Sequence, residues 1–282
     1  MKQKRILAVH DISCVGRCSL TVALPILSAA GFDTSVLPTA VLSTHTGGFS
    51  GFTYRDLTDD IVPICDHWQT LDLSFSSIYT GFLGSFEQIA LTERLFETFK
   101  KPGTLILVDP VMADNGELYG IYSKDMVKGM AGLCKKADII VPNLTEASFM
   151  LDVPYVGDSY DKAYIENLLK KLAETGPEKV VLTGISFDGG KLGAAVYDKN
   201  ENSFSYSFCD RVEGYFHGTG DVFGSSLLAA LENGFPLSRA AEIAVDYTQK
   251  CILKTVELGQ EIRYGVAFEL VLPHLMKLLG LV

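Results

Sequence analysis

The sequence predicts an α/β fold built on a mostly parallel sheet with helices on both faces, and three observations support this prediction. Short apolar runs rich in β-branched residues alternate with longer segments that have a 3.6-residue period. A polar connection joins two later strand-like runs, which indicates an antiparallel hairpin at the sheet edge. No repeat, low-complexity tract or long linker interrupts the 282 residues, so we expect one domain over 1–282.

Six short apolar runs are typical of buried strands in a parallel sheet. They are 5–9, 34–41, 76–83, 104–108, 138–141 and 179–183. The segments between them that have helical length and period are 18–30, 86–100, 123–135 and 160–174. Strands that alternate with helices form parallel sheets covered on both faces, because each crossover carries a helix back over the sheet. We expect 42–60 to depart furthest from this core.

The rest of the chain begins with the edge hairpin and is then helical. The strand-like runs 192–198 and 204–210 are joined by the polar segment 199–203. Three segments of helical length and period follow, and they are 219–234, 238–256 and 266–280. We therefore expect the chain after the hairpin to be almost wholly helical.

Charge and composition narrow the classes of partner. A formal net charge of −10 leaves no basic surplus for a nucleic acid or an anionic membrane. No apolar run approaches the ~20 residues needed to span a bilayer, and the first apolar run ends at His10, too early for a signal peptide. Six scattered cysteines show neither disulfide density nor CxxC spacing. We expect a cytoplasmic protein that binds a small molecule, with no nucleic-acid or membrane partner.

Polar and acidic residues follow the predicted strands where each strand ends. Ligands of such sheets bind beyond these carboxyl ends. The residues are His10, Asp11, Ser13, Gly81, Phe82, Asp109, Asp114, Asn143, Glu146, Thr183 and Gly184. Each residue alone has a structural explanation, as the capping-box spacing of Asn143 and Glu146 illustrates. Because the whole set arrives at one face, a polar active site is the better interpretation.

The segment HGTGDVFG, residues 217–224, places an acid directly behind two glycines at the start of a predicted helix. It does not fit the dinucleotide fingerprint, since Gly224 comes one place late, and the chain has no P-loop motif. Amide N–H groups at a helix N-terminus favour an anion, and small glycines let it approach. If a phosphoryl group occupies that place, Asp221 can accept the proton of an attacking hydroxyl. We expect the amides to keep Asp221 ionised at neutral pH.

A nucleoside triphosphate needs local positive charge, and this chain offers little of it near the glycine segment. Arg211 is the one basic residue that precedes the segment closely. Backbone amides and a divalent cation must therefore neutralise most of the phosphate charge. Asp109, Asp114 and Glu146 suit a hard cation such as Mg²⁺, directly or through its water shell. Phosphoryl transfer relies on such positioning and electrostatics.

Together these motifs resemble the ribokinase-like superfamily. Its features here are GTGD opening a helix, NxxE at 143–146 and DPVM at 109–112. The segments STHTGGFSG at 43–51, TGFLGS at 80–85 and DPVMADNGELY at 109–119 are similar to those of the pyridoxal kinases. The resemblance covers nearly the whole chain. It implies a three-layer α/β/α sandwich, a homodimer, and phosphorylation of the 5′-hydroxymethyl group of a B6 vitamer by ATP with Mg²⁺.

The resemblance also implies roles for individual residues. Asp221 matches the catalytic base, and the anion hole matches Gly218, Thr219 and Gly220. The implied substrate-site residues are Asp11, Ser13, Leu42, His45, Thr46 and Phe82. The implied ATP-site residues are Asp109, Asp114, Tyr119, Asn143, Thr183 and His217, with Asp109 and Glu146 at the metal. The glycine-containing segment 184–191 would form part of a mobile cover over the nucleotide.

Two departures from the pyridoxal kinase pattern leave the substrate and one cation open. The most familiar pyridoxal kinases have a Ser-His pair near Asp11 and Ile12, whereas Asp11 with Ser13 is similar to hydroxymethylpyrimidine kinases. Val141 stands where some relatives place a threonine beside a monovalent cation, so K⁺ is a candidate cofactor and not a required one. Hydroxymethylpyrimidine or a sugar stays open as the acceptor. A ligand-sensing protein without catalysis is the alternative outside enzymes, although ligand binding alone needs no base.

Overall fold

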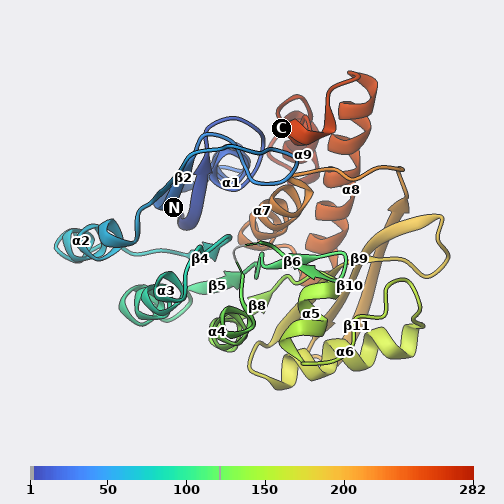
Figure 1. Cartoon of the computed structure of the whole chain (residues 1–282), viewed down its shortest axis with the longest axis horizontal. Coiled ribbons are helices and arrows are strands. Elements are labelled where there is room, and N and C mark those ends of the chain that lie inside the picture. Colours follow the sequence, from blue (N-terminus) through green and yellow to red (C-terminus); the bar gives the residue numbers. More distant parts are fainter. Residues whose placement is uncertain (1–2, 121) are drawn as a thin grey trace.

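The middle layer of the molecule is a mixed β-sheet (Figure 1). The computed structural model describes residues 3–120 and 122–282, and in them the sheet has nine strands. The strands are β1 (Arg5–Ser13), β2 (Asp33–Leu42), β3 (Tyr54–Asp56), β4 (Ser77–Thr80), β5 (Leu105–Val108), β8 (Ile139–Ile140), β9 (Lys179–Ile185), β10 (Lys191–Asp198) and β11 (Ser203–Asp210). Their order across the sheet is β11-β10-β9-β8-β5-β4-β1-β2-β3.

The sheet is parallel in its centre and antiparallel at both edges. From β2 through β1, β4, β5 and β8 to β9, every neighbouring pair is parallel. The strands β10 and β11 form an antiparallel hairpin, which confirms the hairpin predicted at the edge. At the opposite edge β3 also pairs antiparallel, with β2, inside the segment that was expected to leave the core.

Helices cover both faces of the sheet and complete the three layers. They are α1 (Leu20–Ala29), α2 (Thr58–Gln69), α3 (Phe86–Phe99), α4 (Lys124–Cys134), α5 (Leu144–Met150), α6 (Lys162–Glu174), α7 (Thr219–Glu232), α8 (Leu237–Glu257) and α9 (Leu272–Leu278). In Figure 1, α3 to α6 lie below the sheet, and α1, α7, α8 and α9 lie above it. Among the helices described, none has the length and apolar character needed to cross a bilayer.

Two hydrophobic clusters, one on each face, hold these layers together. In β1, Leu7 and Val9 belong to the cluster that includes α3, α4 and α6, whereas Ile6 belongs to the cluster that includes α1, α7 and α8. Side chains alternate between the two faces of a strand, so a strand buried on both faces needs an unbroken apolar run. This explains why the short apolar runs predicted the central strands correctly.

Several elements, the short strand β3 among them, differ from the sequence-based predictions. The helix α2 was not predicted, because Ile61 is its buried residue and Pro63 lies within it, so its apolar pattern is weak. The predicted helix 266–280 is shorter, since a 3₁₀ turn at Glu269–Val271 precedes α9. A small hairpin of β6 (Ala113–Asp114) and β7 (Glu117–Leu118) was also missed, although Asn115 and Gly116 both have positive φ in its two-residue turn.

Candidate active site

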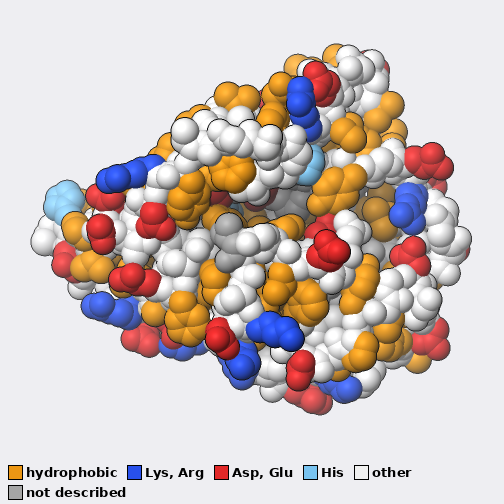
Figure 2. All heavy atoms as spheres, viewed as in Figure 1, with side chains coloured by type: hydrophobic (Ala, Val, Ile, Leu, Met, Phe, Trp, Pro, Cys, Tyr) orange, Lys and Arg blue, Asp and Glu red, His pale blue; other side chains and the backbone are white. Residues whose placement is uncertain are grey.

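A cavity of about 840 Å³ opens where the central parallel strands end. Figure 2 shows the surface hollowed near the middle of the view. The residues of the sequence-predicted site that line it are Asp11, Ser13, Leu42, His45, Thr46, Phe82, Asp109, Asp114, Tyr119, Asn143, Glu146, Thr183, His217, Gly218, Thr219, Gly220 and Asp221. The fold therefore brings these residues into the wall of one cavity. His10 and Gly81 were predicted at the same face but do not line the cavity, because His10 is fully buried and packs against Tyr79 and the backbone of Gly81.

The glycine segment forms the start of α7 and leaves this helix without a side-chain cap. Gly218 is the N-cap residue, with the left-handed φ of 75°. A Cβ atom at Gly218 would lie 2.0 Å from the carbonyl oxygen of Arg17, so glycine is required there. The hydroxyl of Thr219 donates to the carbonyl oxygen of Phe216 at 3.1 Å and does not cap the helix. At Gly220 a Cβ atom would meet nothing within 4 Å, which leaves room for an anion in front of the helix amides.

Asp221 lies in the first turn of α7, partly accessible from the cavity. Burial raises the pKa of Asp221 to about 7; the Ser19 backbone N–H opposes this rise, and the negative charge of Asp11 adds to it. The prediction that helix amides keep Asp221 fully ionised at neutral pH was therefore wrong in direction. Desolvation of the carboxylate outweighs its stabilisation by the amides. A carboxylate that titrates near pH 7 is well matched to accept a proton at neutral pH.

Asp109 and Glu146 form an acidic pair on the side of the cavity that follows β5 and β8. Burial raises the pKa of Asp109 well above its ordinary value, and the negative charges of Glu146 and Asp221 raise it further. Burial likewise raises the pKa of Glu146 to about 7. Arg211 is the only Lys or Arg among the described residues of the cavity wall. Crowded carboxylates with so little positive charge nearby fit a divalent cation, which would relieve their repulsion.

Asn143 and Glu146 have structural hydrogen bonds that limit what else they can bind. The side-chain oxygen of Asn143 accepts from the Glu146 N–H at 2.9 Å, and Glu146 Oε2 accepts from the Asn143 N–H at 2.9 Å. Glu146 Oε1 accepts from the Met112 N–H at 2.9 Å. Both carboxylate oxygens therefore have partners, and direct metal coordination would compete with these bonds. In 3–120 and 122–282 no group of three or more His, Cys, Asp or Glu residues forms a ready metal site.

The opposite side of the cavity combines a buried acid with aromatic and small polar side chains. Asp11 is 3% exposed, its Oδ2 accepts from the Ser13 hydroxyl at 3.3 Å, and its Oδ1 has no hydrogen-bond partner among the described residues. His45 Nε2 lies 2.6 Å from the carbonyl oxygen of Arg263, so it donates a proton there. The Phe82 ring contacts Tyr122 edge to face at a centroid distance of 6.1 Å. This side can take a flat ring with polar substituents.

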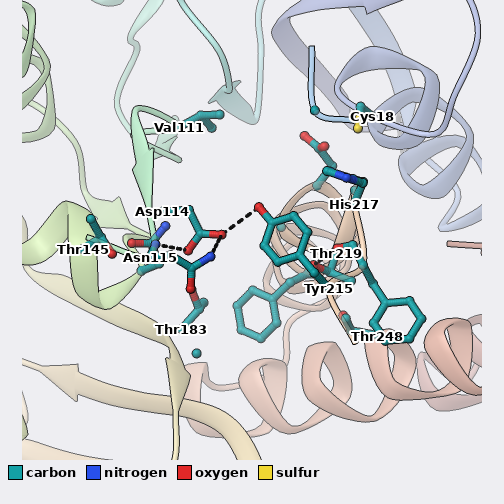
Figure 3. Close-up of a pocket in the computed structure, with 18 of the residues that line it drawn as sticks. Cys18, Val111, Asp114, Asn115, Thr145, Thr183, Tyr215, His217, Thr219 and Thr248 are labelled. Carbon is teal, nitrogen blue, oxygen red and sulfur yellow. Dashed lines mark hydrogen bonds between the residues drawn. The ribbon is translucent and has the colours of Figure 1, made fainter. Parts of the chain in front are cut away.

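The structure also places residues at the cavity that the sequence did not indicate. Cys18 and Ser19 line it beside Asp221, and Phe52 lies on the side of Phe82 and Leu42. The hydroxyl of Tyr215 donates to Asp114 Oδ2 at 2.8 Å (Figure 3). No local signal could have identified Tyr215, because its partner lies 101 positions away in the chain.

Comparison with known proteins places the chain in a family. Residues 27–265 match the family described as phosphomethylpyrimidine kinase. The chain belongs to that family. Pyridoxal kinase of Arabidopsis thaliana is 26% identical over 90% of this chain and 82% of its own. The hydroxymethylpyrimidine/phosphomethylpyrimidine kinase of Mycobacterium tuberculosis is 22% identical over 92% of both chains.

Solved structures agree with this membership and confirm the ribokinase-like fold. A predicted phosphomethylpyrimidine kinase of Bacteroides thetaiotaomicron, in a crystal form with pyridoxal, is 39% identical with a TM-score of 0.93, over 97% of this chain and 96% of its own. Pyridoxal kinase of Lactobacillus plantarum is 29% identical with a TM-score of 0.90, over 98% of each chain. The chain is thus a kinase of the pyridoxal and hydroxymethylpyrimidine kinase type, and kinases of this type use ATP.

Proposed function

We propose that this kinase transfers the terminal phosphoryl group of ATP to the 5′-hydroxymethyl group of a B6 vitamer, namely pyridoxal, pyridoxine or pyridoxamine. The observation that carries the proposal is the uncapped N-terminus of α7, with Asp221 in its first turn and a titration near pH 7. Phosphoryl transfer to an alcohol needs a site that binds the phosphoryl group and a base that accepts the proton of the alcohol. The N-terminus of α7 offers the first, and Asp221 offers the second.

The open N-terminus of α7 and the acidic pair have distinct parts in this reaction. Asp221 removes the proton of the hydroxymethyl group, whose oxygen then attacks the terminal phosphorus of ATP while the bond from that phosphorus to the bridging oxygen breaks and ADP leaves. The amides of Gly218, Thr219 and Gly220 stabilise the transferring phosphoryl group through the positive end of the α7 dipole. Mg²⁺, when bound, neutralises charge on the ATP phosphates, and Asp109 would hold it with Glu146 acting through water.

The choice of a vitamer rests on the relatives and on the shape of the acceptor side. The Bacteroides thetaiotaomicron structure with pyridoxal has the higher identity of the two solved structures compared above. Phe82 and Phe52 both line the cavity, and an aromatic side chain can stack on a flat heteroaromatic ring. One observation favours the second candidate, hydroxymethylpyrimidine, because Asp11 with Ser13 is similar to the kinases of that substrate. A homodimer and a cytoplasmic location accompany the proposal as predictions, and K⁺ stays a candidate cofactor.

A substrate panel tests the proposal. The purified protein is assayed for ATP consumption with each of the three vitamers, with hydroxymethylpyrimidine, with a sugar and without any acceptor. A kcat/KM for a vitamer at least about tenfold above that for hydroxymethylpyrimidine supports the proposal, since this corresponds to about 1.4 kcal/mol of transition-state preference. The reverse order assigns the chain to hydroxymethylpyrimidine. Binding of a vitamer without turnover of any acceptor would indicate a ligand sensor.

A further inference from the structure

The segment 211–218 connects β11 to α7 and lies along the cavity wall. Tyr215 is 48% exposed, yet its hydroxyl has a definite partner, since it donates to Asp114 Oδ2 at 2.8 Å. Figure 3 shows Tyr215 and Asp114 pointing toward one another from different segments of the chain. This bond links the 211–218 segment to the β6–β7 hairpin.

The β6–β7 hairpin is attached to α5 on its other side. The Gly116 N–H donates to the Thr145 hydroxyl at 3.0 Å, and the Asn143 side-chain amide donates to the Ala113 carbonyl oxygen at 2.8 Å. Within the hairpin, Asp114 Oδ1 accepts from the Asn115 N–H at 2.9 Å. The hairpin is therefore hydrogen-bonded to the start of α5 on one side and to Tyr215 of the 211–218 segment on the other.

The 211–218 segment also contacts the acceptor side of the cavity. The His217 ring lies edge to face with Tyr215 at a centroid distance of 5.0 Å, and it lies 5.1 Å from the His45 ring. A Cβ atom at Gly47 would lie 2.6 Å from His217 Cε1, so the loop 43–51 packs its backbone directly against this ring. One continuous set of contacts thus runs from loop 43–51 through His217 and Tyr215 to Asp114.

We propose that Tyr215 is a positioning residue that couples the two binding sides of the cavity. Asp114 lies on the side assigned to the nucleotide, and loop 43–51 lies on the side assigned to the acceptor. A ligand that shifts either segment changes the other through the Tyr215 hydroxyl and the packing of His217 on Gly47. Coupling of this kind is reciprocal, so each ligand changes the affinity of the other by the same factor. The inference rests on the proposed function in one respect, which is that the ligands are a nucleotide and a heteroaromatic alcohol.

Calorimetry tests the coupling with a nonhydrolysable ATP analogue and Mg²⁺, titrated without and with saturating pyridoxal. The coupling factor is the ratio of the two dissociation constants. We expect about fivefold or more in the wild-type protein, the usual lower range for linked sites, and a factor near one in Tyr215→Phe. Gly47→Ala should abolish the coupling from the other end, because its Cβ atom displaces His217 while the Tyr215 hydroxyl is untouched. In both variants the KM values should lose their mutual dependence, with a smaller change in kcat.

Tyr206→Phe is the matched control, since the Tyr206 hydroxyl donates to a carboxylate oxygen of Glu166 at 2.6 Å, between β11 and α6. This variant loses the same kind of bond and should retain the coupling. A wild-type factor of one, or an undiminished factor in Tyr215→Phe, would overturn the inference. If pyridoxal does not bind, hydroxymethylpyrimidine replaces it, so a wrong vitamer assignment is seen separately from a failure of the coupling. If neither alcohol binds, both proposals fail.

Discussion

Two helices have their N-termini in the wall of the same cavity, and they use them in opposite ways. The helix α5 begins after Asn143, whose side-chain oxygen accepts from the Glu146 N–H, while the Glu146 side chain accepts from the Asn143 N–H. The helix α7 begins after Gly218, which has no side chain to cap it. The N-terminus of α5 is therefore capped by side chains of the chain itself, whereas the N-terminus of α7 has no side-chain cap.

A capped helix N-terminus stabilises the fold, whereas an uncapped one can bind a ligand. A capping box satisfies the amides within the chain and fills the space that an anion would need. A glycine in that place leaves both the amides and the space free, at some cost in stability. The two sequences NLTE at 143–146 and GTGD at 218–221 look equally polar. Their geometry differs, because the N-terminus of α5 is capped by side chains and that of α7 is free to meet an anion.

The largest expected effect follows from replacing the acid of the open helix. Asp221→Asn should lower kcat by on the order of 10²–10⁴, because the general base is lost. Binding of a nonhydrolysable ATP analogue should change little, since the helix amides remain. Steady-state kinetics and calorimetry on the same preparation measure both quantities. Near-normal turnover in Asp221→Asn would remove this residue from the role of base.

A smaller effect is expected from straining the backbone at the N-cap of α7. Gly218→Ala places a Cβ atom 2.0 Å from the Arg17 carbonyl oxygen at a φ of 75°. We expect a loss of about 1–3 kcal/mol in the free energy of unfolding, the usual range for strained backbone, together with weaker turnover. Urea unfolding gives the stability. Gly220→Ala is the control, because its Cβ atom meets no neighbour within 4 Å, and an equal loss of stability there would contradict the steric explanation.

The next largest effect is expected in the dependence of kcat/KM on pH. Asp221 must be unprotonated to act as a base, and burial raises its pKa to about 7. Below that pH the protonated fraction grows, so kcat/KM should fall about tenfold per pH unit; above it the value should level off. A pH–rate profile between pH 5 and 9, with stability checked at each pH, measures this. A profile that stays flat down to pH 5 would show that Asp221 titrates at its ordinary pKa.

Elements that bury many side chains have a clear pattern of apolar residues, and the sequence predicted them. Elements that bury few side chains lack that pattern, and the sequence did not predict them. The strand β5 and the first half of β1 are apolar runs and were predicted. The strand β1 continues to Ser13 through the buried polar residues His10 and Asp11, which the pattern did not indicate. The helix α2 has Ile61 as its buried residue, so its pattern carries little information. The β6–β7 hairpin did have a local signal, because Asn115 followed by Gly116 is a strong indicator of a two-residue turn.

The site shows the same division between local and tertiary information. Some residues of the cavity, such as Asp109 and Asn143, followed from the rule that ligands bind at the carboxyl ends of parallel strands. Others, such as Thr46 and Tyr119, came only from the family resemblance. The pKa of Asp221 did not follow, because desolvation depends on the residues that surround it in the folded protein. The Tyr215–Asp114 bond likewise joins two segments whose proximity only the fold creates.

The smallest effect on catalysis should come from the closed helix. Asn143→Ala removes the cap of α5 and the bond to the Ala113 carbonyl oxygen. We expect a loss of about 1–2 kcal/mol in the free energy of unfolding, as for other N-caps, and a smaller loss of turnover than Gly218→Ala causes. Urea unfolding and the KM for ATP distinguish the two roles of Asn143. A large rise in that KM with unchanged stability would make Asn143 a nucleotide ligand, and the contrast between the two helices would then no longer hold.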